Sequence, residues 1–172
     1  MRLSYAGGFT LVEVLVALLV LAVGIAGAAA AQVAATRTRH DTMRMAAAVQ
    51  LAASLAERIR ANPSAAYARF DYHAGRDGPP TAVPFCDGAC DRAQLAEADL
   101  AELRAALHAD FPGGRALVCR DARVWDEARQ AFGWACTSTT QAPLVIKLGW
   151  RMRRVDGSAI DDTPALAMVV GP

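Results

Sequence analysis

Hydrophobic residues are concentrated in one uninterrupted run near the N-terminus. The segment Val14–Ala31 reads VLVALLVLAVGIAGAAAA, which is 18 residues without a polar side chain. A helix of this length spans about 27 Å, close to the thickness of the hydrocarbon core of a bilayer. The run therefore predicts a helix long enough to cross a membrane.

The helical pattern continues beyond the apolar run. Residues 37–62 contain no proline or glycine, and apolar residues recur at steps of three and four at Met45, Ala48, Ala52, Leu55 and Ile59. Asn62 precedes Pro63, and proline disfavours the helical conformation in the residue before it. We expect one helix from Phe9 to Asn62, about 80 Å long, whose second half packs against a globular head. A coiled coil over residues 37–62 is the alternative, and the short, alanine-rich stripe argues against it.

The remaining residues are enough for one small α+β domain. Turn residues between 71 and 91 predict a loop, and Asp91 with Gln94 predicts the capped start of a second helix that ends at Pro112-Gly113-Gly114. The apolar face of this second helix comprises Ala96, Leu100, Leu103, Leu107 and Phe111. Strands are expected at residues 116–120, 132–137, 144–153 and 164–170. A helix followed by strands predicts an antiparallel sheet laid on the long helix.

Charge and composition narrow the classes of function. The chain is 54% apolar and 20% charged, with 18 Lys and Arg against 17 Asp and Glu, for a formal net charge of +1. This balance excludes a nucleic-acid module driven by bulk charge and excludes an acidic disordered chain. Arg151, Arg153 and Arg154 form only a small basic cluster, so no nucleic-acid partner is expected.

The eight residues that precede Phe9 do not form an ordinary secretory signal. Such a signal places its small-residue cleavage site after the apolar segment. Here Gly7 and Gly8 come before it. A cut after Gly8 would remove residues 1–8 as a leader and retain the hydrophobic helix.

Glu13 is a carboxylate at the start of the apolar helix, where it costs a few kcal/mol unless it is paired, protonated or near the interface. The next cation along the chain, Arg37, lies about 36 Å away on a helix. A partner from a second chain is therefore expected, and after cleavage the free α-amino group of Phe9 is a suitable cation. The alternative is that Glu13 simply lies among the lipid headgroups.

The segment Gly8–Ala17, GFTLVEVLVA, resembles the class III signal of type IV pilins and pseudopilins. The resemblance implies a type IV pilin-like lollipop fold. It also implies that a prepilin peptidase cuts between Gly8 and Phe9 and N-methylates Phe9, and that Glu13 pairs with the terminal amine of a neighbouring subunit.

The orientation in the membrane has two opposing indications. Arg37, Arg39 and Arg44 follow the apolar run and by the positive-inside rule favour a cytoplasmic C-terminal side. The pilin-type leader and the cysteines favour an oxidising compartment. We expect residues 9–36 to lie in the inner membrane and residues 37–172 to form a periplasmic head that later enters an extracellular pilus.

Four cysteines, Cys86, Cys90, Cys119 and Cys136, allow three disulfide connectivities. Cys86 and Cys90 flank a tight turn, and Cys119 and Cys136 fall on or beside two expected strands, so we favour these two pairs. Zinc is the alternative, but a spacing of three and then sixteen intervening residues is poor for four thiolate ligands. A redox dithiol needs two intervening residues and is less favoured.

The head resembles the PilV-like minor pilins, the type IV pilus modification family. The resemblance rests on residues 56–62 followed by Tyr67, on Cys86 with Cys90, on residues 107–114 and on the late strand with Trp150. It implies a subunit that helps to initiate and assemble pili with other minor and major pilins and with the inner-membrane assembly machinery. A type II secretion pseudopilin is the close alternative.

Enzymatic and metal-binding interpretations have little support. His40, His73 and His108 lie in three different segments, and the chain contains no nucleophile elbow or phosphate-binding loop. Asp161-Asp162 are expected in a solvated turn, and Trp125, Trp134 and Trp150 are expected to fill the core and strands. We expect no cofactor and no enzymatic activity; a membrane-anchored periplasmic enzyme or binding protein is the alternative from another class.

Overall fold

The computed structural model describes residues 8, 10–80, 86, 88–153, 159–160 and 163–171. It divides into two compact units, Met1–Thr42 and Met43–Pro172, and the second unit is called the head below. Phe9 and Asp161-Asp162, which carried expectations from the sequence, lie outside the described residues.

One long helix, α1 (Leu11–Ala61), has 51 residues and runs through the expected region. It ends just before Asn62 and Pro63, as the proline predicted. In the head it buries Ala48, Ala52, Leu55, Ala56 and Ile59. Met45, the first residue of the expected stripe, is 36% exposed and lies outside this core.

The main sheet of the head has the strand order β1-β2-β5-β8, with every neighbouring pair antiparallel. Its strands are β1 (Asp71–His73), β2 (Arg115–Arg120), β5 (Leu144–Gly149) and β8 (Leu166–Val170). The two long central strands pair from Arg115 with Gly149 to Arg120 with Leu144. The expected antiparallel sheet is therefore confirmed, with β1 as an additional edge strand.

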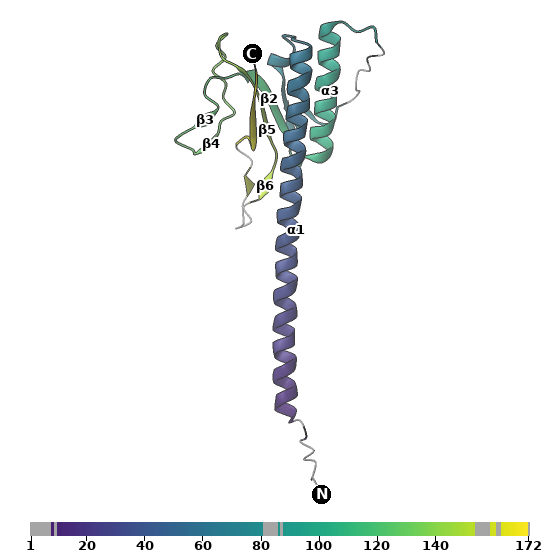
Figure 1. Cartoon of the computed structure of the whole chain (residues 1–172), viewed down its shortest axis with the longest axis vertical. Coiled ribbons are helices and arrows are strands. Elements are labelled where there is room, and N and C mark those ends of the chain that lie inside the picture. The colour runs from purple at the N-terminus through teal and green to yellow at the C-terminus, as the bar shows by residue number, and fades with distance from the viewer. Residues whose placement is uncertain are drawn as a thin grey trace. The chain divides into compact units, whose positions relative to one another are not determined.

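A second helix, α3 (Arg92–Asp110), lies beside the head portion of α1 (Figure 1). Its start is a full capping box, in which Asp91 accepts from the backbone of Gln94 and the Gln94 side chain accepts from the N–H of Asp91. The five apolar residues expected on one face of this helix are all buried. They share one core cluster with α1 and with Val118, Ile146 and Leu148 of the sheet.

The shorter elements correct three expectations. The stretch 71–91 is not all loop, because it contains β1 and the short helix α2 (Ala74–Asp77), which follow the turn η1 (Tyr67–Arg69). The strand expected at 132–137 is limited to β4 (Ala131–Phe132), which pairs with β3 (Trp125–Asp126) in a separate hairpin.

The third correction concerns the strand expected at 144–153. It is interrupted between β5 and β6 (Met152–Arg153), and β6 pairs with β7 (Ala159–Ile160). The Arg151 N–H donates to the carbonyl of Pro112 at 2.8 Å, so this peptide group bonds to the turn after α3. Trp150 remains in the core, where its ring packs against Phe111 at a centroid distance of 5.1 Å.

Candidate assembly site

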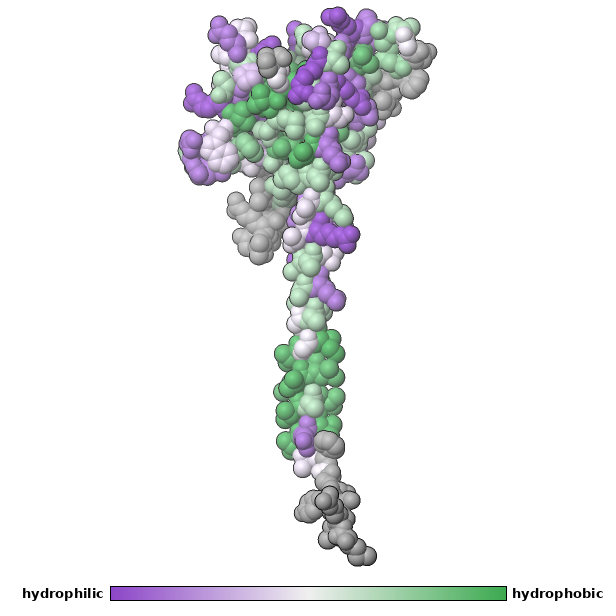
Figure 2. Space-filling model, viewed as in Figure 1, coloured by the Kyte–Doolittle hydropathy of each residue, from purple (hydrophilic) through white to green (hydrophobic). Residues whose placement is uncertain are grey.

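The N-terminal part of α1 presents an apolar surface that no other described residue covers. All residues from 11 to 42 are exposed, and the large aliphatic side chains between Leu11 and Ile25 have exposures from 49% to 77%. Figure 2 shows this band of hydrophobic residues on the helix. Among the described helices α1 alone is long and apolar enough to cross a membrane. Exposed aliphatic area on this scale is stable only in lipid or against other apolar helices.

Glu13 lies in the first turn of α1. Its backbone N–H donates to the carbonyl of Thr10 at 3.1 Å and lies 3.3 Å from the Thr10 hydroxyl, so Thr10 satisfies the start of the helix. The carboxylate benefits from the positive end of the helix dipole. None of the ion pairs found among the described residues involves Glu13.

The expected cleavage position is only partly described. Gly8 is exposed, and no heavy atom lies within 4 Å of the position that a Cβ would occupy there. The space on the Cβ side of Gly8 is therefore open.

In the polar segment that follows the apolar run, three threonine hydroxyl groups bond to the backbone of the helix itself. The hydroxyls of Thr36, Thr38 and Thr42 each donate to the carbonyl four residues earlier, at distances of 2.9, 3.2 and 2.9 Å. These bonds keep the hydroxyl groups on the helix itself, which reduces the cost of placing them beside an apolar environment.

Inside the head, a charged cluster joins the end of α1 to α3. The Arg58 guanidinium donates to Asp99 at 2.8 Å and to Glu102 at 2.6 Å, and the buried Tyr67 hydroxyl donates to Asp99. Burial and the hydrogen bond to Asp99 raise the pKa of the Tyr67 phenol. Asn62 adds a bond from its amide to the carbonyl of Arg92 at 2.9 Å. The cluster fixes the exit of α1 relative to α3.

A second charged pair lies on the opposite face of the sheet. The Lys147 ammonium is 2.6 Å from Asp121 and also donates to the carbonyls of Gly133 and Ala135 at 2.7 and 2.6 Å. Both side chains are almost fully buried. Burial raises the pKa of Asp121, but the hydrogen bonds from Lys147 and from the Arg123 N–H outweigh burial, so the pKa of Asp121 is lowered.

These bonds attach residues 121–142, called the outer lobe below, to the sheet. Trp134 of the lobe packs directly on Gly149, where a Cβ would lie 2.8 Å from the Trp134 ring. The Arg115 guanidinium lies 4.1 Å from the centroid of the same ring. These contacts explain why residues 134–136 cover the sheet and do not extend it as a strand.

The cysteines form two disulfides, Cys86 with Cys90 and Cys119 with Cys136. Cys119 belongs to β2, whereas Cys136 lies in the outer lobe, outside any strand. The second disulfide therefore fastens the lobe to the sheet beside the Lys147 pair. The first closes a short segment before α3.

Other residues singled out in the sequence are dispersed. His40 lies on α1, His73 on β1 and His108 on α3, and no group of three His, Cys, Asp or Glu residues in the described chain is arranged to hold a metal ion. Trp125, one of the tryptophans expected in the core or on a strand, lies on the strand β3, where it is 40% exposed and packs edge-on against Phe132. It is outside the core because β3 pairs only with β4, in a hairpin separate from the main sheet.

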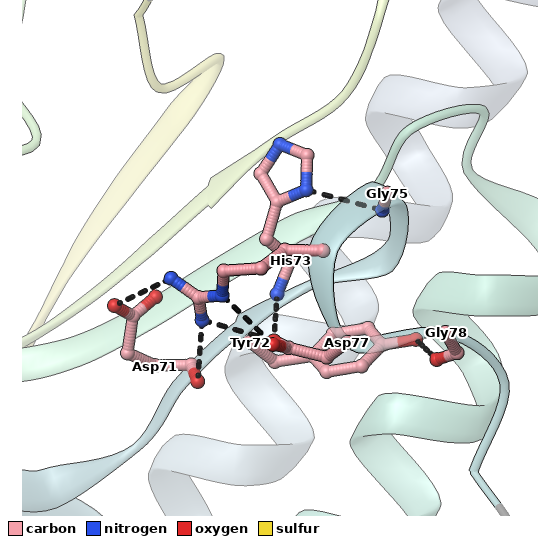
Figure 3. Close-up of polar contacts among 7 residues, drawn as sticks. Asp71, Tyr72, His73, Gly75, Asp77 and Gly78 are labelled. Carbon is pink, nitrogen blue, oxygen red and sulfur yellow. Dashed lines mark hydrogen bonds and ion pairs between the residues drawn. The ribbon is translucent and has the colours of Figure 1, made fainter.

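The edge strand β1 carries a further polar cluster (Figure 3). Arg76 of α2 bonds Asp77 at 2.7 Å and lies 3.5 Å from Asp71, and the His73 N–H donates to Asp77 at 2.8 Å. The bonds from Arg76 and from the His73 N–H lower the pKa of Asp77 to about 2. Asp77 is therefore ionised at neutral pH, and the cluster lies at the edge of the sheet.

Comparison with protein families gives two matches. The model described as the prokaryotic N-terminal methylation motif matches residues 3–29, and the model described as type IV pilin Tt1218 matches residues 30–101. These matches support a type IV pilin subunit. Comparisons with the curated proteins and with the solved structures found no match.

The pilin match includes the rest of α1, the turn η1, β1 and the first part of α3. The fold agrees with it, because a long N-terminal helix is followed by a small head with one further long helix and an antiparallel sheet. Type IV pilins are structural subunits, and the methylation motif implies processing by a peptidase and association with other pilins. The sequence did not reveal the Arg58–Asp99 and Lys147–Asp121 pairs, since each partner is more than 25 residues from the other and no local pattern joins them.

Proposed function

We propose that this chain is a minor pilin of the PilV-like kind, which takes part in the initiation and assembly of type IV pili. It enters the filament through its N-terminal helix and acts without catalysis. Its partners are the prepilin peptidase, other minor and major pilins, and the assembly machinery of the inner membrane.

The exposed apolar surface of α1 over residues 11–31, in which Glu13 is the single carboxylate, is the observation that carries the proposal. Before assembly, lipid surrounds the helix, and we infer that residues 1–8 face the cytoplasm while the head lies in the periplasm. During assembly, the helices of other pilins replace the lipid. Transfer between two apolar surroundings costs little hydrophobic free energy, so polar contacts decide which position a subunit takes.

Glu13 supplies such a contact. Cleavage between Gly8 and Phe9 creates a terminal amine, which N-methylation leaves cationic. In an apolar environment an unpaired carboxylate is costly, and a neighbouring chain that offers its Phe9 amine removes this cost. Pairing between chains therefore favours one axial offset between subunits, which is what ordered addition to a filament requires.

The PilV-like assignment has support in the head. The segment 56–62 and Tyr67, which carried the resemblance, belong to the charged cluster that fixes α1 against α3. A rigid exit from α1 suits a subunit whose head must take a defined position on the filament. A type II secretion pseudopilin shares the leader and the helix, and only the host assembly distinguishes the two.

The experiment measures processing and incorporation in cells that produce pili. We expect the wild-type mature chain to begin with N-methylated Phe9 by intact-mass analysis, and to remain uncut in cells without prepilin peptidase. Glu13→Ala should be processed normally but should fall at least tenfold in purified pili. Glu57→Ala is the matched control, because Glu57 is an exposed carboxylate on the same helix whose ion pair among the described residues is with Arg60 at the surface.

An uncut chain that retains Met1 in the presence of the peptidase would overturn the processing step. Normal incorporation of Glu13→Ala would overturn the pairing step. Recovery of the mature chain with secretion components, in place of pili, would assign it to the pseudopilins.

A further inference from the structure

The two edge strands of the main sheet, β1 and β8, differ in whether side chains bond to their outward-facing backbone groups. At β1, the Phe70 carbonyl accepts from the Val118 N–H and the Ala74 N–H donates to the Gly114 carbonyl. Successive residues of a strand turn their backbone groups to opposite sides, so Asp71 and His73 turn theirs away from β2.

Side chains of α2 bond to one outward backbone group of each of these two residues. Asp77 accepts from the His73 N–H at 2.8 Å, and Arg76 donates to the Asp71 carbonyl at 3.4 Å (Figure 3). Another strand therefore finds charged side chains and occupied hydrogen-bonding groups there. Natural sheets commonly protect their edges in this way.

The opposite edge, β8, has no comparable protection within the described chain. It pairs with β5 on one side only, and its sequence Leu-Ala-Met-Val-Val contains no charge and no proline. An uncharged edge strand with free backbone groups is a template for another strand.

The register identifies which groups of β8 are available. The Asp121 N–H donates to the Pro143 carbonyl, so odd-numbered residues of β5 face β2 and even-numbered residues face β8. Ile146 then pairs with Met168, which leaves Ala167 and Val169 with their N–H and C=O groups turned outward. The Val169 side chain is also 53% exposed.

An apolar groove of about 790 Å³ continues from the end of β8 toward the end of α1. Its lining includes Ile59, Pro63, Ala65, Ala68, Pro143 and Leu144. The two cations of the lining are already engaged, Arg60 with Glu57 and Arg120 with the Ala142 carbonyl. Figure 2 shows hydrophobic residues gathered over β8. Because both cations of the groove lining are already bonded, the groove offers no charged group to an acidic or basic partner, and it suits an uncharged one.

Resting on the proposed pilin function, we propose that β8 receives an extended, uncharged strand from a different pilin subunit, which adds to the sheet by backbone pairing. A strand satisfies the outward groups of Ala167 and Val169 together, and its alternate apolar side chains enter the groove. A second copy is disfavoured, because antiparallel pairing of β8 with itself would point the head portions of the two α1 helices in opposite directions, whereas two copies anchored in one membrane by the same N-terminal segment share one orientation.

Photo-crosslinking of the full chain in pilus-producing cells tests the proposal. A photoreactive phenylalanine analogue is placed at Val169 or, as the matched control, at Leu95, an apolar residue of α3 that is 40% exposed. We expect position 169 to cross-link to an extended segment of another subunit that carries the N-terminal methylation motif, with at least tenfold higher yield than position 95. The cross-linked residues are mapped by mass spectrometry.

Two variants examine the backbone contribution. Ala167→Pro removes one outward N–H, which an edge strand tolerates, and should reduce the cross-link from position 169 at least tenfold. Val169→Lys, without the photoreactive group, should lower co-purification with the mapped subunit by a similar factor, whereas Leu95→Lys should not. Thermal unfolding of each variant within a few degrees of wild type verifies the fold.

Cross-links to a second copy of this chain, equal yields from positions 169 and 95, or yields that Ala167→Pro leaves unchanged would each overturn the proposal. Each of these outcomes can be distinguished from failure of the proposed pilin function itself. A chain that is not cleaved at Phe9 or is absent from pili is recognised by its mass and its fractionation before any cross-link is measured.

Discussion

Lys147 and Asp121 are opposite charges enclosed between the sheet and the outer lobe. Their exposures are 0% and 1%, so neither charge can be solvated by water if the other is lost. Breaking a buried ion pair by removing one partner costs about 3–5 kcal/mol, because it leaves an uncompensated charge. We expect Asp121→Asn to destabilise the full chain by this amount at neutral pH, measured by urea unfolding in detergent micelles with the disulfides intact.

The pH dependence of the same variant gives a second measurement. The pKa of Asp121 is lowered in the folded chain, so its contribution is present above the ordinary value near 3.8 and is lost as pH falls below it. The difference between wild type and Asp121→Asn should therefore shrink as the pH falls below about 4, where the unfolded carboxyl group begins to be protonated. The exposed pair Arg60–Glu57 is the control, and Glu57→Gln should change stability by less than about 1 kcal/mol. Equal effects of the two substitutions would contradict the importance of burial.

At the scale of elements, periodic and capped segments were the ones that the sequence predicted well. Asn62 followed by Pro63 predicted where α1 ends, and the capping box of Asp91 and Gln94 predicted where α3 begins. Both signals lie in residues next to the helix terminus, so the sequence reveals them. The strand expected at 132–137 failed because distant residues hold this segment: the Trp134 ring packs on Gly149, and the carbonyls on either side of Trp134 accept hydrogen bonds from Lys147. Lys147 alternates like a solvent-facing residue, and only the position of the outer lobe makes it buried.

The two proposed contact sites also differ in whether the sequence reveals them. Glu13 is recognisable from the sequence, because a lone carboxylate at the start of an apolar helix is energetically unfavourable without a partner. The free edge of β8 is not recognisable from the sequence. Only the strand order and the register reveal that β8 is paired on one side while side chains of α2 protect β1.

The outer lobe also supports a prediction about its disulfide. Cys119 and Cys136 are 17 residues apart, whereas Cys86 and Cys90 are 4 apart. By loop-closure entropy the longer bridge stabilises by about 3 kcal/mol and the shorter by about 2 kcal/mol. The double substitution C119A/C136A should therefore lower the free energy of unfolding more than C86A/C90A does, by urea titration. The reverse order would indicate that the Lys147 contacts alone hold the lobe.

At the scale of the whole molecule, the two compact units have separate sources of stability. Every buried residue of α1 lies between Ala48 and Ile59, and residues 11–42 contribute none to the core of the head. The head should therefore fold without them. We expect residues 43–172, exported to an oxidising compartment, to give a soluble protein that unfolds cooperatively within a few degrees of the full chain by circular dichroism.

The same truncation separates stability from assembly. If the N-terminal helix supplies incorporation, the isolated head should be absent from pili even when it is folded, because it lacks Glu13 and the apolar surface that other helices contact. An enzyme tethered to the membrane would behave differently, since its activity would survive removal of the anchor. If the isolated head entered pili, contacts of the head, including the β8 edge, would be sufficient for recruitment. The apolar surface of α1 and Glu13 would then not be required for incorporation.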